Sequence, residues 1–217
     1  LAFGDIFMVF NNQKKGLDTV TDYHRNLDIT EATTTTSYTQ DGTTFKRETF
    51  SSYPDDVTVT HLTKKGDKTL DFTLWNTLTE DLIANGQYSR DNSNYKKGTI
   101  SVDSNGILLK GAVKDNGLKF ASYLGIKTDG QVTAQDGYLT VKGASYATLL
   151  LSAKTNFAQN PETNYRKDID VEKTVKSIVE AAKAKDYETL KNDHIKDYQS
   201  LFNRVQLNLG GSKSNQT

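Results

Sequence analysis

The stretch ATTTTSYTQDGTTFKRETFS, residues 32–51, shows most directly what kind of fold this chain adopts. Two runs rich in threonine and aromatic residues, 32–39 and 44–51, flank the dipeptide Asp41-Gly42. β-Branched and aromatic side chains favour strands, and Asp-Gly suits a tight turn with positive φ. The stretch therefore predicts two antiparallel strands joined by a hairpin turn.

The same pattern continues from the start of the chain to Thr155. Further Asn-Gly and Asp-Gly dipeptides begin at Asn105, Asn116, Asp129 and Asp136, and they predict more hairpins. Many of the runs are long, which favours two large stacked sheets over a small immunoglobulin-like sandwich. The predicted strands are 5–10, 20–29, 32–39, 44–51, 57–64, 69–74, 95–103, 107–114, 118–128, 138–142 and 147–153.

The pattern becomes helical after Asn160-Pro161. Asp170 is placed to cap a first helix, whose apolar residues recur at helical spacing. A second helix is predicted over 186–203, followed by a short strand over 205–209. We expect the two helices to form a hairpin over one end of the sandwich. The apolar residues of the first helix are Val171, Val175, Ile178, Val179 and Ala182.

The overall composition excludes several classes of protein. The 217 residues include 27 Lys and Arg against 27 Asp and Glu, so the chain lacks the basic surface expected of a nucleic-acid-binding protein. The absence of cysteine excludes disulfides, thiolate metal sites and a cysteine nucleophile. No apolar run approaches the roughly 18 residues of a membrane-spanning helix, so no membrane insertion of this segment is expected.

The carboxylates form no local catalytic constellation. Hydrolysis of a glycosidic bond needs two carboxyl groups, or one carboxyl group and a positioned water, at a defined separation. Asp55-Asp56 follows Pro54 and is expected to be a polar turn, and Glu80-Asp81 is expected to be a solvated loop. We therefore predict no catalytic residue from these pairs.

The histidines and glycines predict neither a metal site nor a cofactor. His24, His61 and His194 are far apart in the sequence and have no supporting motif. His24 is expected to be exposed, whereas His194 and His61 are expected to be hydrogen-bonded packing residues. No glycine-rich phosphate-binding motif is present, and no cofactor is predicted.

Trp75, the only tryptophan, ends a predicted strand beside Asn76. An exposed aromatic ring can stack on a sugar while a neighbouring amide binds its hydroxyl groups. Trp75 and Asn76 are therefore candidate sugar-binding residues, and Tyr88, Tyr95 and Tyr123 could lie near them on loops. The alternative is that Trp75 belongs to the core.

Five segments match a known series of motifs in the same order. They are FGDI at 3–6, YHRNLDI at 23–29, RETFSSYPDDV at 47–57, AKTNF at 153–157 and HIKDYQSLFNRV at 194–205. Together they resemble the N-terminal region of glycoside hydrolase family 95, the α-L-fucosidases. The ordered series is fairly specific, whereas any one motif alone is weak.

The resemblance implies a mainly β fold: a large antiparallel two-sheet super-sandwich over 1–160 and a helical hairpin linker over 161–217, leading to an (α/α)6 barrel. Because the chain begins at Leu1, we expect it to be an excised piece, with its first strands and the barrel missing. In that family the inverting mechanism uses a Glu general acid and a water positioned by Asn and Asp, all in the barrel. The chain alone is therefore expected to be inactive.

The resemblance also implies what the parent protein does. We expect it to hydrolyse terminal α-L-fucose, α1,2-linked, from glycans, so the partners of this chain would be its own barrel and, through the parent, a fucosylated glycan. Two alternatives stay open: a carbohydrate-binding module that uses Trp75, and the same domain of a related glycosidase or disaccharide phosphorylase.

The motif residues on the strands are expected to have structural roles. Arg25 and Asp28 on one predicted strand, and Arg47 and Glu48 on another, could pair across the sheet or hold a loop against the barrel. The composition, rich in Thr, Asn, Lys and Tyr, is typical of a secreted or cell-surface protein of a Gram-positive bacterium, with a cytoplasmic location as the alternative.

The motif residues on the second helix complete the candidate set of interface or structural positions. His194 and Tyr198 lie on the apolar stripe, and Arg204 could bind the terminal carbonyls of the helix or an acid of the sandwich. Apolar surface around Tyr198 and Phe202 is expected to be exposed if the barrel normally covers it.

Overall fold

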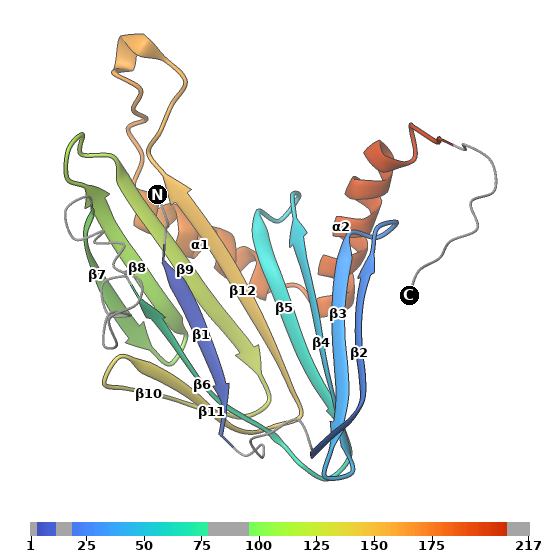
Figure 1. Ribbon diagram of the computed structural model, residues 1–217. Coiled ribbons are helices and arrows are strands. Elements are labelled where there is room, and N and C mark those ends of the chain that lie inside the picture. The colour runs from blue at the N-terminus through green and yellow to red at the C-terminus, as the bar shows by residue number, and fades with distance from the viewer. Residues whose placement is uncertain (1–3, 12–18, 78–95, 208–217) are drawn as a thin grey trace, which may run out of the picture.

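The computed structural model describes residues 4–11, 19–77 and 96–207. Over these residues the chain forms two antiparallel sheets followed by two C-terminal helices, which confirms the predicted fold class (Figure 1). Every strand predicted between residues 5 and 153 is present, with ends that differ by up to three residues from the prediction.

The large sheet has eight strands in the order β2-β3-β4-β5-β12-β9-β8-β7. Most of its neighbours are also consecutive in sequence, as the hairpin signals predicted, and β12 is the strand that joins β5 to β9. The strands are β2 Val20–Asp28, β3 Thr33–Gln40, β4 Thr43–Ser52, β5 Val57–Lys65, β7 Lys96–Asp103, β8 Gly106–Val113, β9 Lys119–Thr128 and β12 Tyr146–Thr155.

The small sheet has four strands in the order β1-β6-β11-β10. They are β1 Asp5–Phe10, β6 Leu70–Thr77, β11 Tyr138–Ala144 and β10 Gln131–Gln135. The sequence analysis missed β10, because its QVTAQ sequence has only five residues, two of them apolar, and most of it is exposed, so its alternation is too short to be recognised as a strand.

The turns show where the hairpin signal succeeds and where it fails. Asp41 and Gly42 have φ of 50° and 73°, and Asp136 and Gly137 have φ of 52° and 82°, as the β3–β4 and β10–β11 hairpins require. Asp129-Gly130 instead connects β9 of the large sheet to β10 of the small sheet, so a hairpin at this site was a wrong prediction. Asp129 stabilises this connection between the sheets, because its Oδ1 accepts a hydrogen bond from Ser145 N at 2.9 Å.

The sandwich core lies between the two sheets. Figure 1 shows the small sheet lying over only part of the large one. On the inner face of β2 to β4, Phe45 packs into the core whereas Arg25 and Arg47 are exposed, so this face is partly open. A groove of about 490 Å³ runs along this open region, between β1 and the large sheet. The core is built from Leu62, Ile107, Ile126 and Leu149 of the large sheet and Phe72, Leu74, Leu139 and Val141 of the small sheet.

The two helices are α1, Val171–Lys183, and α2, Tyr187–Phe202. Asp170 caps α1 by accepting from Lys173 N at 3.0 Å, as predicted, and Asp186 caps α2 by accepting from Thr189 N at 2.7 Å. Val205 to Leu207 form no strand, contrary to the prediction for 205–209, and the rest of that range lies outside the described residues.

The helices cover the outer face of the large sheet and not one end of the sandwich as expected. The reason is that the central strands carry apolar side chains on both faces, so they must be covered twice. No helix among the described residues is long and apolar enough to span a bilayer. The second core joins Val171, Val175, Val179 and Ala182 of α1 to Val57, Val59, Leu108, Tyr123 and Leu150 of the sheet.

Gly125 on β9 sets how closely α1 approaches the sheet. A Cβ atom at Gly125 would lie 2.5 Å from Cγ1 of Val179, which is fully buried. We expect Gly125→Ala to lower the free energy of unfolding by about 1 to 3 kcal/mol, because either α1 or the strand must shift. Urea denaturation measures this loss.

Val179→Ala provides the internal control, because it removes the atom that the new Cβ would meet. In the Val179→Ala variant, Gly125→Ala should lower the free energy of unfolding by less than it does in the original chain. The difference between the two losses, the coupling energy, should be at least about 0.5 kcal/mol. An undiminished loss in the double variant would place the strain somewhere other than the α1 contact.

Candidate functional site

The turn between β2 and β3 presents three consecutive backbone carbonyls to α2. Tyr198 Oη donates to Ile29 O at 2.7 Å, Gln199 Nε2 donates to Thr30 O at 3.0 Å, and His194 Nε2 lies 2.9 Å from Glu31 O. A carbonyl can only accept, so the Nε2 atom of His194 carries its proton. The motif HIKDYQ at 194–199 thus fastens α2 to the turn that follows the YHRNLDI motif.

Asp28 shapes the turn that α2 recognises. Its Oδ1 accepts from Thr30 N at 2.8 Å, from Thr30 Oγ1 at 2.7 Å and from Glu31 N at 3.2 Å. The hydrogen bonds from the Thr30 side chain and backbone lower the pKa of Asp28 below its ordinary value. Asp28 therefore stabilises the turn on which α2 packs, while its predicted role in holding a loop against the barrel stays a prediction.

His194 is the centre of an aromatic row along α2. It is buried, and its ring stacks on Phe50 of β4 at a centroid distance of 4.8 Å. The row continues to Tyr198 and then to Phe202, with Tyr198 and Phe202 5.1 Å apart. His194 therefore has the hydrogen-bonded packing role that the apolar stripe predicted.

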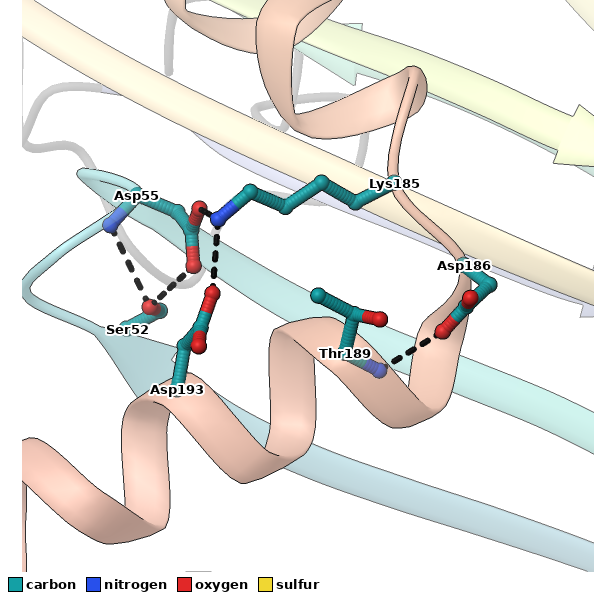
Figure 2. Close-up of polar contacts among 6 residues, drawn as sticks. All are labelled: Ser52, Asp55, Lys185, Asp186, Thr189 and Asp193. Carbon is teal, nitrogen blue, oxygen red and sulfur yellow. Dashed lines mark hydrogen bonds and ion pairs between the residues drawn. The ribbon is translucent and has the colours of Figure 1, made fainter.

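Lys185, in the turn between the helices, fastens the helical hairpin to the end of β4. Figure 2 shows its Nζ between Asp55 Oδ1 and Asp193 Oδ2, both at 2.7 Å. The Asp55 side chain is only 5% exposed and also accepts from Ser52 Oγ at 2.7 Å. The hydrogen bonds to Asp193 and Asp55 raise the pKa of Lys185 above its ordinary value. The polar turn predicted at Asp55-Asp56 is present, and the sequence did not indicate that the Asp55 side chain is buried in it.

Glu48 forms the third connection between α2 and the sheet. Its nearly buried carboxylate pairs with Lys191 of α2 at 2.9 Å and with Lys46 of its own strand at 2.6 Å. Burial alone would raise the pKa of Glu48, but the hydrogen bonds from Lys46 and Lys191 outweigh it and lower the pKa.

Arg25 and Arg47 lie away from this junction, on the open inner face of the large sheet. The strand register places Arg25, Thr36 and Arg47 in one row across β2, β3 and β4, where they line the groove beside β1. Within the part of the chain that the structure describes, neither arginine pairs with Asp28 or Glu48. Arg204 binds a terminal carbonyl of its own helix, with Nε donating to Ser200 O at 2.9 Å.

Trp75 and Asn76 point to opposite faces of β6, because successive residues of a strand alternate. Trp75 is partly buried on the outer face, stacked on Phe7 at 5.2 Å and edge-on to Tyr138 at 5.7 Å. Asn76 is buried on the inner side. The structure therefore does not bring these two candidate sugar ligands together.

The other aromatic and acidic candidates are dispersed. Tyr123 lies under α1, where burial raises its pKa to about 12. Tyr88, Tyr95 and Glu80-Asp81 lie outside the described residues.

The remaining histidines behave as the sequence predicted. His24 is exposed on β2. His61 is partly buried, with Nδ1 2.8 Å from Thr148 Oγ1 and its ring stacked on Tyr187 at 3.8 Å, and burial lowers its pKa. Over the described ranges, no group of three or more His, Asp or Glu is arranged to hold a metal ion.

The residues that sequence reasoning missed are Lys185, Lys191 and Asp193, together with the burial of Asp55. They are charged residues in polar segments, and Asp55 and Lys185 are 130 positions apart. No local pattern reports such a contact.

Comparison with known proteins shows the family to which this chain belongs. The model of the glycosyl hydrolase family 65 N-terminal domain matches residues 1–160. The chain belongs to this family. The match confirms the prediction that this chain is the N-terminal domain of a glycoside hydrolase. The curated relatives described next are consistent with a family 95 domain.

Those relatives are named as fucosidases. The chain is 28% identical to Alpha-L-fucosidase 2 of Arabidopsis thaliana over 99% of its own length and 26% of that protein. It is 28% identical to Probable alpha-fucosidase A of Aspergillus niger over 89% of its own length and 24% of that protein. The chain thus spans about a quarter of the length of the curated relatives it matches.

Solved structures share the fold at low sequence identity. A chain named as a kojibiose phosphorylase from the human microbiome matches with a TM-score of 0.55 and 12% identity, over 83% of this chain and 23% of that one. A bacterial glucoamylase in complex with acarbose matches with a TM-score of 0.51 and 12% identity, over 91% of this chain and 31% of that one. These likenesses describe architecture alone.

Lys185→Met tests how strongly the hairpin is fastened. The change leaves the buried Asp55 carboxylate without its cation, and we expect a loss of about 1 to 2 kcal/mol in the free energy of unfolding, at the low end because Lys185 is partly solvated. The matched control is Lys173→Met at an exposed position of α1, which should change stability by less than about 0.5 kcal/mol. Equal effects of the two changes in urea denaturation would contradict the assignment.

The pH dependence of stability tests the Glu48 pairing. The pKa of Glu48 is lower in the folded chain than in the unfolded chain, so its contribution is fully present above the ordinary pKa of about 4.3 and is lost as the pH falls through the folded value. We expect Glu48→Gln to flatten the decline of stability between about pH 5 and pH 3. Glu162→Gln, at an exposed position, should leave that decline unchanged.

Proposed function

We propose that this chain is the non-catalytic N-terminal part of a longer α-L-fucosidase, and that it holds the catalytic domain through α2. Its similarity to two proteins named as fucosidases, each about four times its length, supports the assignment. The family match to a glycosyl hydrolase N-terminal domain supports the non-catalytic role.

The exposed apolar end of α2 is the observation that carries the supporting role. The helix is fixed to the sandwich by the three carbonyl contacts and by Lys185, yet four apolar side chains in its last turn and in the residues after it are open to solvent. The exposed fractions are 57% for Leu201, 39% for Phe202, 80% for Val205 and 79% for Leu207. Apolar residues grouped in this way at a rigid helix end are typical of a surface that another domain covers.

The exposure expected around Phe202 is confirmed, whereas Tyr198 is only partly exposed because its hydroxyl binds Ile29 O. Ile29, which follows β2 and whose carbonyl binds Tyr198, is also exposed, at 61%. We take Ile29 and the apolar residues at the end of α2 as one docking surface for the catalytic domain. The surface is named below as the α2 docking surface.

In this proposal the parent hydrolyses terminal α1,2-linked α-L-fucosyl groups, with inversion at the anomeric carbon. This chain supplies no catalytic group to that reaction. Two acidic or water-positioning groups on the catalytic domain would perform that chemistry. The alternative of a related glycosidase or phosphorylase draws on fold likeness at 12% identity, which is weaker support than the fucosidase relatives. The secreted Gram-positive location stays a prediction, since the curated relatives are from a plant and a fungus.

Fucose release from 2′-fucosyllactose tests the proposal. We expect the full-length parent to release fucose and the 217-residue chain to release none, because the reacting groups lie on the catalytic domain. Release by neither protein would contradict the fucosidase assignment, and release by the chain alone would contradict its non-catalytic role.

Substitution of the α2 docking surface in the parent provides the second arm. Phe202→Asp places a charge where the catalytic domain should cover apolar surface, and we expect a lower thermal midpoint together with faster loss of fucosidase activity on warming. Val9→Asp, at an exposed position of β1 in the small sheet, on the side of the large sheet opposite α2, is the control and should leave both unchanged.

A further inference from the structure

The segment between β12 and α1 forms a projecting loop, residues 156–167, that extends beyond the sheets in Figure 1. The loop is ordered by its own hydrogen bonds. Asn156 is buried, its Oδ1 accepts from Lys119 N at 2.9 Å, and its carbonyl accepts from Lys167 N at 2.7 Å. The loop is therefore fixed to the β8–β9 hairpin at its base. The contacts described so far do not explain why it is built this way.

Two aromatic rings are displayed on this loop. Phe157 and Tyr165 are parallel to within 4°, with centroids 6.3 Å apart, near the outer limit for offset stacking. They remain 50% and 46% exposed. The rings therefore overlap little, and each keeps part of its face open to solvent, unlike Trp75, which packs between two other rings.

The backbone holds Tyr165 in a conformation that aromatic residues rarely adopt. Asn164 and Tyr165 have φ of 51° and 57°, in the left-handed region. Both backbone polar groups of Tyr165 are bonded, with N donating to Asn160 O at 2.9 Å and O accepting from Ala158 N at 3.1 Å. A strained aromatic residue that stays exposed points to a role for its side chain outside the core.

Polar groups converge beside the rings. Arg166 Nη2 donates to Asn116 O at 2.9 Å and Nη1 donates to Tyr165 O at 3.0 Å, which fixes the guanidinium and leaves further N–H groups available. A cavity of about 540 Å³ opens between these side chains. It is lined by Asn116, Leu118, Phe157, Asn164, Tyr165 and Arg166.

We propose that this cavity is a glycan-binding subsite that takes one neutral sugar unit. The C–H face of a pyranose would stack on Tyr165 and Phe157, while the side chains of Asn116, Asn164 and Arg166 would bind its hydroxyl groups. Open aromatic faces beside fixed amide and guanidinium donors suit a sugar better than an apolar protein surface, which would leave those donors unpaired. The inference goes beyond the proposed function, and it requires neither fucosidase activity nor the α2 docking surface.

Tyr165→Gly is the informative variant, because it removes the ring and relieves the positive φ at the same position. We expect its thermal midpoint to stay equal to that of the original chain or to rise. Isothermal titration of the 217-residue chain with 2′-fucosyllactose and with lactose, up to about 10 mM, should show binding that Tyr165→Gly and Phe157→Ala each weaken by about fivefold or more.

Tyr53→Ala is the matched control, since it removes another exposed tyrosine ring and should leave binding unchanged. The absence of binding to both sugars, or binding that neither loop variant weakens, would overturn the proposal. Weaker association of the loop variants with the separately produced remainder of the parent, with no effect on sugar binding, would overturn it in favour of a contact between domains. None of these readouts is fucose release, so failure of the subsite and failure of the fucosidase assignment are distinguishable.

Discussion

The three carbonyl groups of residues 29–31 are the constraint on which the position of α2, and with it the proposed docking surface, depends. Backbone carbonyls that leave a sheet at a turn must find donors, and here the donors are side chains spaced along one face of α2. Because the contacts are to consecutive residues, they fix the position of α2 along the turn as well as its distance from it. Two ion pairs also restrain α2. Lys185, just before the helix, pairs with Asp55 at the end of β4, and Lys191 within the helix pairs with Glu48 on β4.

The large sheet is the middle of three layers. Its central strands bury apolar side chains against the small sheet on one face and against α1 on the other. Gly125 permits the second contact, because no side chain stands between β9 and Val179. This arrangement means that α1 is part of the core of the sandwich, while α2 is bound mainly through polar contacts and ring stacking and carries the surface that we propose as a docking surface.

Local patterns in the sequence were enough to predict most of the strands, the β3–β4 hairpin at Asp41-Gly42 and the cap at Asp170, because each depends on neighbours within a few positions. The packing of His194 also followed from its place on an apolar stripe. The Lys185 contact with Asp55 could not be predicted, since the two residues meet only after the sheet and the helices have formed. The position of the helices was missed for a related reason: the apolar outer face of β5, β9 and β12 is apparent only when the strand order is known. For the candidate site, the sequence identified the motif segments but not their partners, and only the structure showed that side chains of the 194–205 motif bind backbone groups at the end of the 23–29 motif and just after it.

The position of β12 has a consequence for how the chain folds. Strands β2 to β5 and strands β7 to β9 each form by local hairpins, whereas β12 pairs with β5 on one side and β9 on the other. Until β12 arrives, each hairpin unit has an unpaired edge of the kind that recruits strands from other chains. The large sheet is therefore completed late during synthesis, by a segment that follows every other strand, and its two halves are most prone to aggregate in the interval before that step.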